Sequence, residues 1–201
     1  MQKKQIIAFD IDDVLAKTAE GFTTYSNAQW GTTLLPSDFS EDWINMWQVA
    51  PEEMLRRSKI FHGSDVVLHY EPNFGAVAVL DKLRTTYDLR LATSRQHGHK
   101  EYTSTWIDAH FPEMFNDIHY SGIFDDDSLS AHKRTKADLL EEIGATYLID
   151  DQLKHCIAAA ERGIKAVLFG DYTWNQADVL PPGVHRCATW KEVAEYFDEQ
   201  S

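Results

Sequence analysis

Hydrophobic positions in the last two thirds of the chain alternate between helical and strand-like spacing. After Pro72, apolar residues at helical spacing over 76–83 are followed by the short segment 89–92 (Leu-Arg-Leu-Ala), which we interpret as a strand. The same alternation continues in further expected helices (99–111, 139–143, 153–160 and 190–197) and strands (147–149 and 165–169). Strands that alternate with helices of this length indicate an α/β fold: a three-layer, Rossmann-like core whose parallel sheet is covered on both faces.

The first strand is expected in the apolar run that ends at Phe9, and the run stops abruptly at acids. Asp10 and Asp12 lie two residues apart, so the strand end would present both carboxylates in a crevice. Two carboxylates held together are unfavourable unless a proton or a cation neutralises them. This pair therefore indicates a metal-assisted chemical site.

Residues 16–72 interrupt the alternation, because no clear buried strand appears there. Three helix-like pieces are expected instead: 19–29, 41–49 and 51–59. An insertion after the first strand would lie over the carboxyl end of the sheet, where a lid belongs. We therefore expect residues 1–15 and 73–201 to form the catalytic core and residues 16–72 to form a small helical cap.

Two features of this cap region have a structural and a functional interpretation. Trp43 and Trp47, four residues apart, would either stack on a base or form the core of the cap, and we favour the core. Arg56, Arg57 and Lys59 would either attract an anionic substrate or form a solvated helix face, and we favour the solvated face.

Candidate metal ligands outside the acids are weak. Cys156 and Cys187 have neither metal-binding spacing nor a disulfide framework, and Cys156 is expected to pack in the core. His97 and His99 flank a loop glycine, and we favour a solvent-facing position for both over metal ligation.

The composition fits one domain, or one core with a modest insertion: 201 residues, 43% of them hydrophobic. The net charge of −13 disfavours binding to a nucleic-acid polymer or to an anionic membrane. We find no signal peptide and no transmembrane run, so a cytoplasmic protein is expected. The acidic run 125–127 is expected to be a solvated loop.

Three further motifs lie where such a sheet would bring them to the acids. Thr93, Ser94 and Arg95 follow the second core strand and offer hydroxyls and backbone N–H groups to an anion. Lys136 opens a helix, where an ammonium suits phosphate oxygens, and we favour it over its neighbours Lys133 and Arg134. The pair 150–151 consists of aspartates that end a strand, as Asp10 does.

The ordered set resembles the four-motif signature of the haloacid dehalogenase superfamily of phosphohydrolases: Asp10, Asp12, Thr93, Lys136, Asp150 and Asp151. Within it the chain is most similar to the 5′(3′)-deoxyribonucleotidase-like branch, on the segments 14–16, 93–94 and 172–175. The chain departs from that branch twice. Asp13 stands where the branch often has Gly, and Thr173 stands where its Trp-Asn motif carries Pro.

The resemblance implies a role for each acid. Asp10 would be the nucleophile that forms an aspartyl-phosphate, and Asp12 would protonate the leaving alkoxide and then activate water. Crowding by Asp10 and Asp13 would raise the pKa of Asp12. Mg²⁺ would be held by the Asp10 carboxylate, the Asp12 carbonyl and Asp150, with Asp151 in support. Three residues would bind the phosphoryl oxygens: Thr93, Ser94 and Lys136.

The resemblance thus implies an Mg²⁺-dependent phosphatase of a small phosphorylated metabolite, with a (deoxy)nucleoside monophosphate as the leading candidate. A sugar phosphate or a phosphoglycolate-like acid remains open. Two other classes remain as well: a metal-dependent glycosyltransferase, and a catalytically idle phosphate-binding scaffold on the same fold. The sequence leaves the oligomeric state open.

Overall fold

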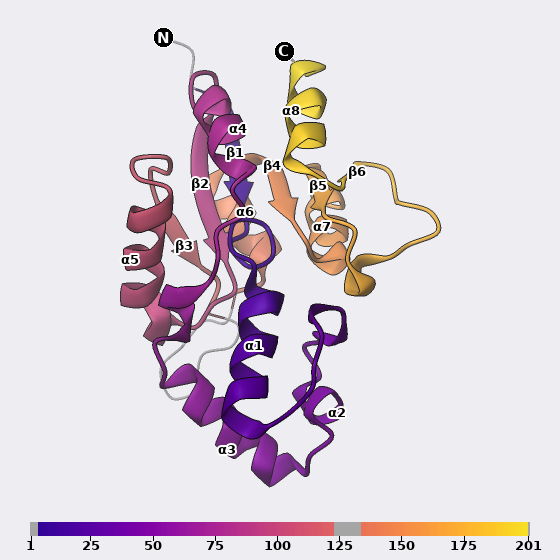
Figure 1. The fold of residues 1–201 in the computed structure, drawn as a ribbon. Coiled ribbons are helices and arrows are strands. Elements are labelled where there is room, and N and C mark those ends of the chain that lie inside the picture. The colour runs from indigo at the N-terminus through magenta and orange to yellow at the C-terminus, as the bar shows by residue number, and fades with distance from the viewer. Residues whose placement is uncertain (1–3, 123–133, 201) are drawn as a thin grey trace.

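A six-stranded parallel sheet forms the centre of the molecule (Figure 1). The computed structural model describes residues 4–122 and 134–200, so the acidic run 125–127 lies outside the described residues. The strands are β1 (Ile6–Phe9), β2 (Asp88–Thr93), β3 (Ile118–Tyr120), β4 (Ala145–Asp150), β5 (Lys165–Phe169) and β6 (Val184–Cys187). Every neighbouring pair is parallel.

The strand order is β3-β2-β1-β4-β5-β6. The chain moves outward from β1 to β3 and then returns to place β4 on the other side of β1. The carboxyl ends of β1 and β4 therefore flank the point where the strand order reverses, which is where open α/β sheets bind ligands. The sheet thus places the ends of the two acid-bearing strands side by side.

Helices cover both faces of the sheet, as predicted. Alternate residues of β1 enter two separate hydrophobic clusters: Ile7 and Phe9 enter one, and Ile6 and Ala8 the other. The first cluster includes side chains from α4 (Ala76–Leu83), α5 (Lys100–His110) and α8 (Trp190–Asp198). The second cluster includes side chains from α6 (Lys136–Ile143) and α7 (Leu153–Ala160). The three-layer α/β architecture is confirmed.

The insertion after β1 is helical, also as predicted, and lies beyond the carboxyl end of the sheet (Figure 1). It contains α1 (Thr18–Trp30), η1 (Pro36–Asp38), α2 (Trp43–Trp47), α3 (Pro51–His62) and η2 (Val66–His69). Its two ends meet: Asn73 N donates to Leu15 O at 2.6 Å, and Lys17 N donates to Glu71 O at 2.8 Å. The division at 15/16 and 72/73 stays a prediction, although the chain enters and leaves the cap at this paired segment.

The cap has its own aromatic core. The Phe22 and Trp47 rings stack 5.5 Å apart, and Trp43 packs on both. Trp47 donates from its indole nitrogen to Ser26. The structural interpretation of the two tryptophans therefore holds, although Trp43 also lines a cavity described below. The prediction of a solvated helix face is wrong for Arg57, because its guanidinium lies over the Trp30 and Trp47 rings.

Two strands and one buried histidine were not expected from the sequence. Strand β3 has three residues, and β6 reads Val-His-Arg-Cys, which has neither an apolar run nor an alternation of apolar and polar residues, so neither strand carries a strong periodic signal. His99 is buried, contrary to the solvent-facing prediction, because the cap packs over its short helix η3 (His97–His99); His97 is exposed as predicted. In the described part of the chain, no helix is long and apolar enough to span a membrane.

Candidate active site

Three buried carboxylates converge between the ends of β1 and β4. Asp10 follows β1 directly, and its N–H donates to Ile149 O of β4 at 2.9 Å. Asp150 is the last residue of β4, and Asp151 follows it. One carboxylate oxygen from each of these acids lies within 4.8 Å of the other two. The structure therefore brings together acids that are 140 residues apart in the sequence.

Lys136 lies between two of these acids. It is the first residue of α6 and is buried, and its Nζ lies 2.6 Å from Asp150 Oδ2 and 3.0 Å from Asp10 Oδ1. Burial alone would lower the pKa of Lys136, but the two carboxylates raise it above its ordinary value. Its neighbour Arg134 instead pairs with Glu142, and Lys133 lies outside the described residues.

The acid cluster carries more negative charge than Lys136 can balance. Burial raises the pKa of Asp10 to about 7. Burial, reinforced by the Asp150 and Asp10 carboxylates, also raises the pKa of Asp151 well above its ordinary value. Asp10 Oδ1 is buried and makes no directed hydrogen bond, although it lies within ion-pair distance of Lys136. Clustered carboxylate oxygens of this kind suit a hard divalent cation such as Mg²⁺, so the residues present fit that ion.

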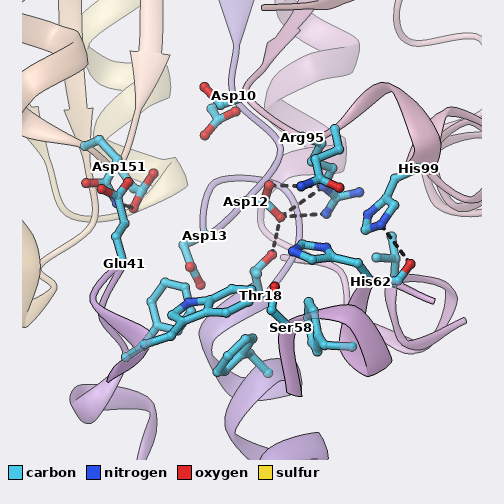
Figure 2. A pocket seen from close by; sticks show the side chains of 18 of the residues that line it. Asp10, Asp12, Asp13, Thr18, Glu41, Ser58, His62, Arg95, His99 and Asp151 are labelled. Carbon is cyan, nitrogen blue, oxygen red and sulfur yellow. Dashed lines mark hydrogen bonds and ion pairs between the residues drawn. The ribbon is translucent and has the colours of Figure 1, made fainter. Parts of the chain in front are cut away.

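Asp12 points to a different partner. The Arg95 guanidinium forms a bidentate ion pair with the Asp12 carboxylate: Nη2 lies 2.6 Å from Oδ1, and Nε lies 3.0 Å from Oδ2 (Figure 2). Thr18 Oγ1 also donates to Oδ1 at 2.6 Å. Burial would raise the pKa of Asp12, but Arg95 and Thr18 lower it below its ordinary value. The expectation that crowding by Asp10 and Asp13 raises this pKa is therefore wrong, because the neighbouring cation outweighs both burial and the acids.

Asp13 explains one departure from the branch pattern. Its φ of 54° lies in the left-handed region, which glycine adopts freely and aspartate tolerates. Its carboxylate accepts the Ala19 N–H at 3.0 Å, at the start of the first cap helix. Burial raises the pKa of Asp13 to about 8. The position therefore requires a residue that tolerates positive φ, and aspartate adds a contact that glycine lacks.

The hydroxyls after β2 face different surroundings. Thr93 is fully buried, and its Oγ1 accepts the Arg95 N–H at 3.1 Å, which shapes the turn after the strand. Ser94 lines the cavity above the acids, and its Oγ is buried without a hydrogen-bond partner. Ser94 thus has a hydroxyl available for a ligand, whereas the Thr93 oxygen already accepts one backbone N–H and keeps its O–H as a donor.

A cavity of about 540 Å³ separates the acids from the cap. Aromatic side chains of the cap line one part of it: Phe22, Phe39, Trp43, Phe61 and Tyr70. Three histidines also line it: His62, His99 and His155. His62 and His99 meet with ring centroids 5.0 Å apart, and His99 Nε2 lies 3.1 Å from His62 O (Figure 2). This volume is in the range of sites for small organic ligands.

Sequence reasoning missed two kinds of residue at this site. The sequence places Arg95 in a hydroxyl-bearing motif but does not indicate its pairing with Asp12. The cavity histidines were missed because their burial depends on how the cap packs. The sequence does contain a signal for Arg95. It follows Thr93 and Ser94 at the end of β2, and β2 lies next to β1, whose end carries Asp10 and Asp12.

A parallel sheet with acids at its switch point and a helical cap defines an α/β phosphohydrolase of the haloacid dehalogenase type. A profile of the family described as 5′-nucleotidase, deoxy (pyrimidine), cytosolic type C (NT5C) matches residues 4–197. The chain belongs to this family, so it is a phosphoric monoester hydrolase of the nucleotidase type. A search of curated proteins gave no match.

Solved structures share the fold at low sequence identity. A haloacid dehalogenase-like hydrolase from Streptococcus pneumoniae superimposes with a TM-score of 0.73 at 18% identity, covering 98% of this chain and 100% of the other. Protein tyrosine kinase A from Mycobacterium tuberculosis gives 0.68 at 17%, covering 98% and 99%. A D,D-heptose 1,7-bisphosphate phosphatase from B. bronchiseptica, complexed with magnesium and phosphate, gives 0.57 at 16%, covering 98% and 99%. At these identities the likeness shows the fold.

Proposed function

We propose that the chain is an Mg²⁺-dependent 5′-nucleotidase that hydrolyses (deoxy)nucleoside monophosphates. The observation that carries the proposal is the juxtaposition of the Asp10–Asp150–Asp151 cluster with a cavity lined by cap aromatics. The cluster suits a phosphoryl group bound with a cation, and the rings suit a planar base. The pyrimidine deoxynucleotide in the family's description supports the same substrate class.

Asp10 would attack phosphorus and form an aspartyl-phosphate, which water then hydrolyses. Lys136 would balance the charge on Asp10 and on the phosphoryl oxygens, and Ser94 would donate its unpaired hydroxyl to them. Thr93 would act by shaping the turn that presents Ser94. Mg²⁺, held by Asp10, Asp150 and the Asp12 carbonyl, would lower the negative charge that the phosphate meets. Asp151 would orient the ion or bind it directly.

Asp12 would act as acid in the first step and as base in the second. The Arg95 contact favours its ionised form, which is the form that activates water. Protonation of the leaving oxygen would therefore require that substrate binding weakens the Arg95 grip. A phosphate dianion close to Arg95 would supply that competition.

The alternative substrates are smaller. A sugar phosphate or a phosphoglycolate-like acid would reach the acids but would leave the aromatic part of the cavity unfilled. The net charge of −13 opposes binding to a nucleic-acid polymer or an anionic membrane. A cytoplasmic location agrees with the word cytosolic in the family's description.

Phosphate release from a panel of monophosphates tests the proposal. The panel contains pyrimidine and purine 5′-deoxynucleotides and ribonucleotides, a hexose phosphate and phosphoglycolate, each with Mg²⁺ and with a chelator. We expect turnover of nucleotides that is lost with chelator and in Asp10→Asn. Preference for the small phosphates would refute the nucleotide assignment. Sugar release from nucleotide-sugars would indicate a glycosyltransferase, and inactivity across the panel would indicate an idle scaffold.

A further inference from the structure

A short turn after β5 contacts the acid cluster, the Asp13 backbone and the cap. The turn comprises η4 (Thr173–Asn175) and Tyr172, which precedes it. Tyr172 Oη donates to Asp13 O at 2.7 Å, and Trp174 Nε1 donates to Asp151 Oδ2 at 2.6 Å. Asn175 Nδ2 donates to Asp151 O at 3.0 Å. The side chain and the backbone of Asp151 are therefore both held by this turn.

The same turn contacts the cap. Thr173 Oγ1 donates to Ser37 O at 2.9 Å. The Phe39 ring meets the Trp174 ring edge-on, with centroids 5.5 Å apart. The Tyr172 ring stacks on the same Trp174 ring, with centroids 4.6 Å apart and an interplanar angle of 5°. Ser37 lies in η1 and Phe39 follows it, so the indole that holds Asp151 is packed against the cap.

The orientation of Asp151 depends on few groups. Asp151 is buried, and its Oδ2 accepts from Trp174 at 2.6 Å and from Gln152 Nε2 at 2.9 Å. A carboxylate close to a metal site needs such partners to fix its plane, and their removal typically weakens metal affinity by about 10–100-fold. Trp174 makes the shorter of the two contacts and is the one supported by ring packing.

We infer that Trp174 is a positioning residue for the divalent cation: it sets the orientation of Asp151, and its contact with Phe39 links cation binding to the cap segment 36–39. The inference rests on the proposed function, because it requires that the acid cluster binds Mg²⁺. It assigns a purpose to the Trp-Asn motif that the reaction steps above do not use.

Isothermal titration of Mg²⁺ into the full chain tests the inference. Trp174→Phe keeps a ring between Tyr172 and Phe39 but loses the N–H donor, so we expect its Kd to rise about tenfold or more. Trp190→Phe is the matched control, because the Trp190 indole nitrogen is buried without a partner; its Kd should stay within about twofold of wild type. In an Asp151→Ala background, Trp174→Phe should add less than about twofold.

Hydrogen exchange supplies a readout of the cap link. Mg²⁺ should slow amide exchange over residues 37–39 in the wild type and have no such effect in Trp174→Phe. If Trp174→Phe does not fold, indole N–H resonances of wild-type protein carrying ¹⁵N-tryptophan decide: that of Trp174 should move on Mg²⁺ addition and that of Trp190 should not.

The outcomes separate the two proposals. A wild type that does not bind Mg²⁺ contradicts the proposed function and with it the inference. A wild type that binds Mg²⁺, with unchanged affinity in Trp174→Phe or an unmoved Trp174 resonance, overturns the inference alone.

Discussion

Replacement of Arg95 by Met tests whether the grip on Asp12 matters for catalysis. Arg95 makes contacts of 2.6 to 3.1 Å to both Asp12 oxygens, and it also donates to Thr103 of α5 at 3.3 Å. Methionine retains much of the aliphatic stem and removes every donor. Of the described hydrogen-bond donors, Asp12 would then keep the Thr18 hydroxyl, and its carboxylate would be free to leave its observed orientation.

The expected loss of stability is moderate. Removing one partner of a buried ion pair costs about 3–5 kcal/mol, because the other charge stays buried without compensation. The Asp12 side chain is 31% exposed, so water would solvate part of the remaining charge. We therefore expect a decrease of about 2 kcal/mol in the free energy of unfolding, measured by urea denaturation. The variant should remain folded at room temperature.

The expected loss of activity depends on the leaving group. Loss of Arg95 would raise the pKa of Asp12 and so favour its acid form, but it would also let the carboxylate turn away from the leaving oxygen. A positioned general acid contributes about 10²–10⁴-fold, so we expect the loss of orientation to outweigh the pKa change and Arg95→Met to lower kcat/KM for a nucleoside 5′-monophosphate by about 10²-fold. 4-Nitrophenyl phosphate releases a phenolate that needs no proton, so its kcat/KM should fall less than about tenfold. Because kcat/KM reports the path up to the first irreversible step, the comparison isolates leaving-group departure from hydrolysis of the aspartyl-phosphate.

A matched variant within β2, the strand that precedes Arg95, supplies the control. Arg90 pairs with Asp88 at 2.8 Å in β2, away from the cavity, so Arg90→Met makes the same chemical change outside the site. Its kcat/KM should be unchanged for both substrates. An equal loss for both leaving groups in Arg95→Met, or no loss at all, would refute the positioning role of Arg95 and leave it a structural residue.

Two further predictions concern stability. At the left-handed position of Asp13, Asp13→Ala should unfold more easily than Asp13→Gly by about 1 kcal/mol in urea, since alanine resists positive φ; equal stabilities would contradict the strain argument. Burial lowers the pKa of His62 from 6.5 to about 4, so the unfolded chain binds the extra proton between these values and stability falls as pH decreases through that window. The free energy of unfolding in urea should fall less from pH 7 to pH 5 in His62→Phe than in the wild type or in the control His69→Gln, which changes an exposed histidine. An equal fall in His62→Phe and the wild type would contradict the role of His62 in this pH dependence.

The sheet, the cap and the acid cluster were predictable because each depends on local pattern. The apolar run before Asp10 and the run before Asp150 identify buried strands, and parallel strands with intervening helices place both ends at one edge. The start of a helix at Lys136 follows from its capping residue Thr135, which accepts the N–H of Asp138. These features require no knowledge of distant contacts.

The remaining features depend on tertiary packing. Arg95 has a long side chain with several rotamers, and its choice of Asp12 is fixed by Thr103 of α5 and by Tyr70 of the cap, whose ring lies 6.0 Å from the guanidinium carbon. His99 is buried where the cap backbone and ring of His62 contact it. Neither contact leaves a periodic signal in the sequence, since the partners lie on separate elements.

The charges around the site give a reason for the proposed cation to bind before phosphate. The partners of these four acids differ: Asp10 and Asp150 share Lys136, Asp12 has Arg95, and within the described residues Asp151 accepts from the neutral donors Trp174 and Gln152. The four carboxylates, if ionised, exceed the two cationic side chains by two negative charges. A phosphate dianion entering that field would be repelled, and the repulsion is strong because the acids are largely buried. A divalent cation held beside Asp151 would remove the excess, so the proposed cation would contribute most at the acid for which residues 4–122 and 134–200 provide no cationic partner.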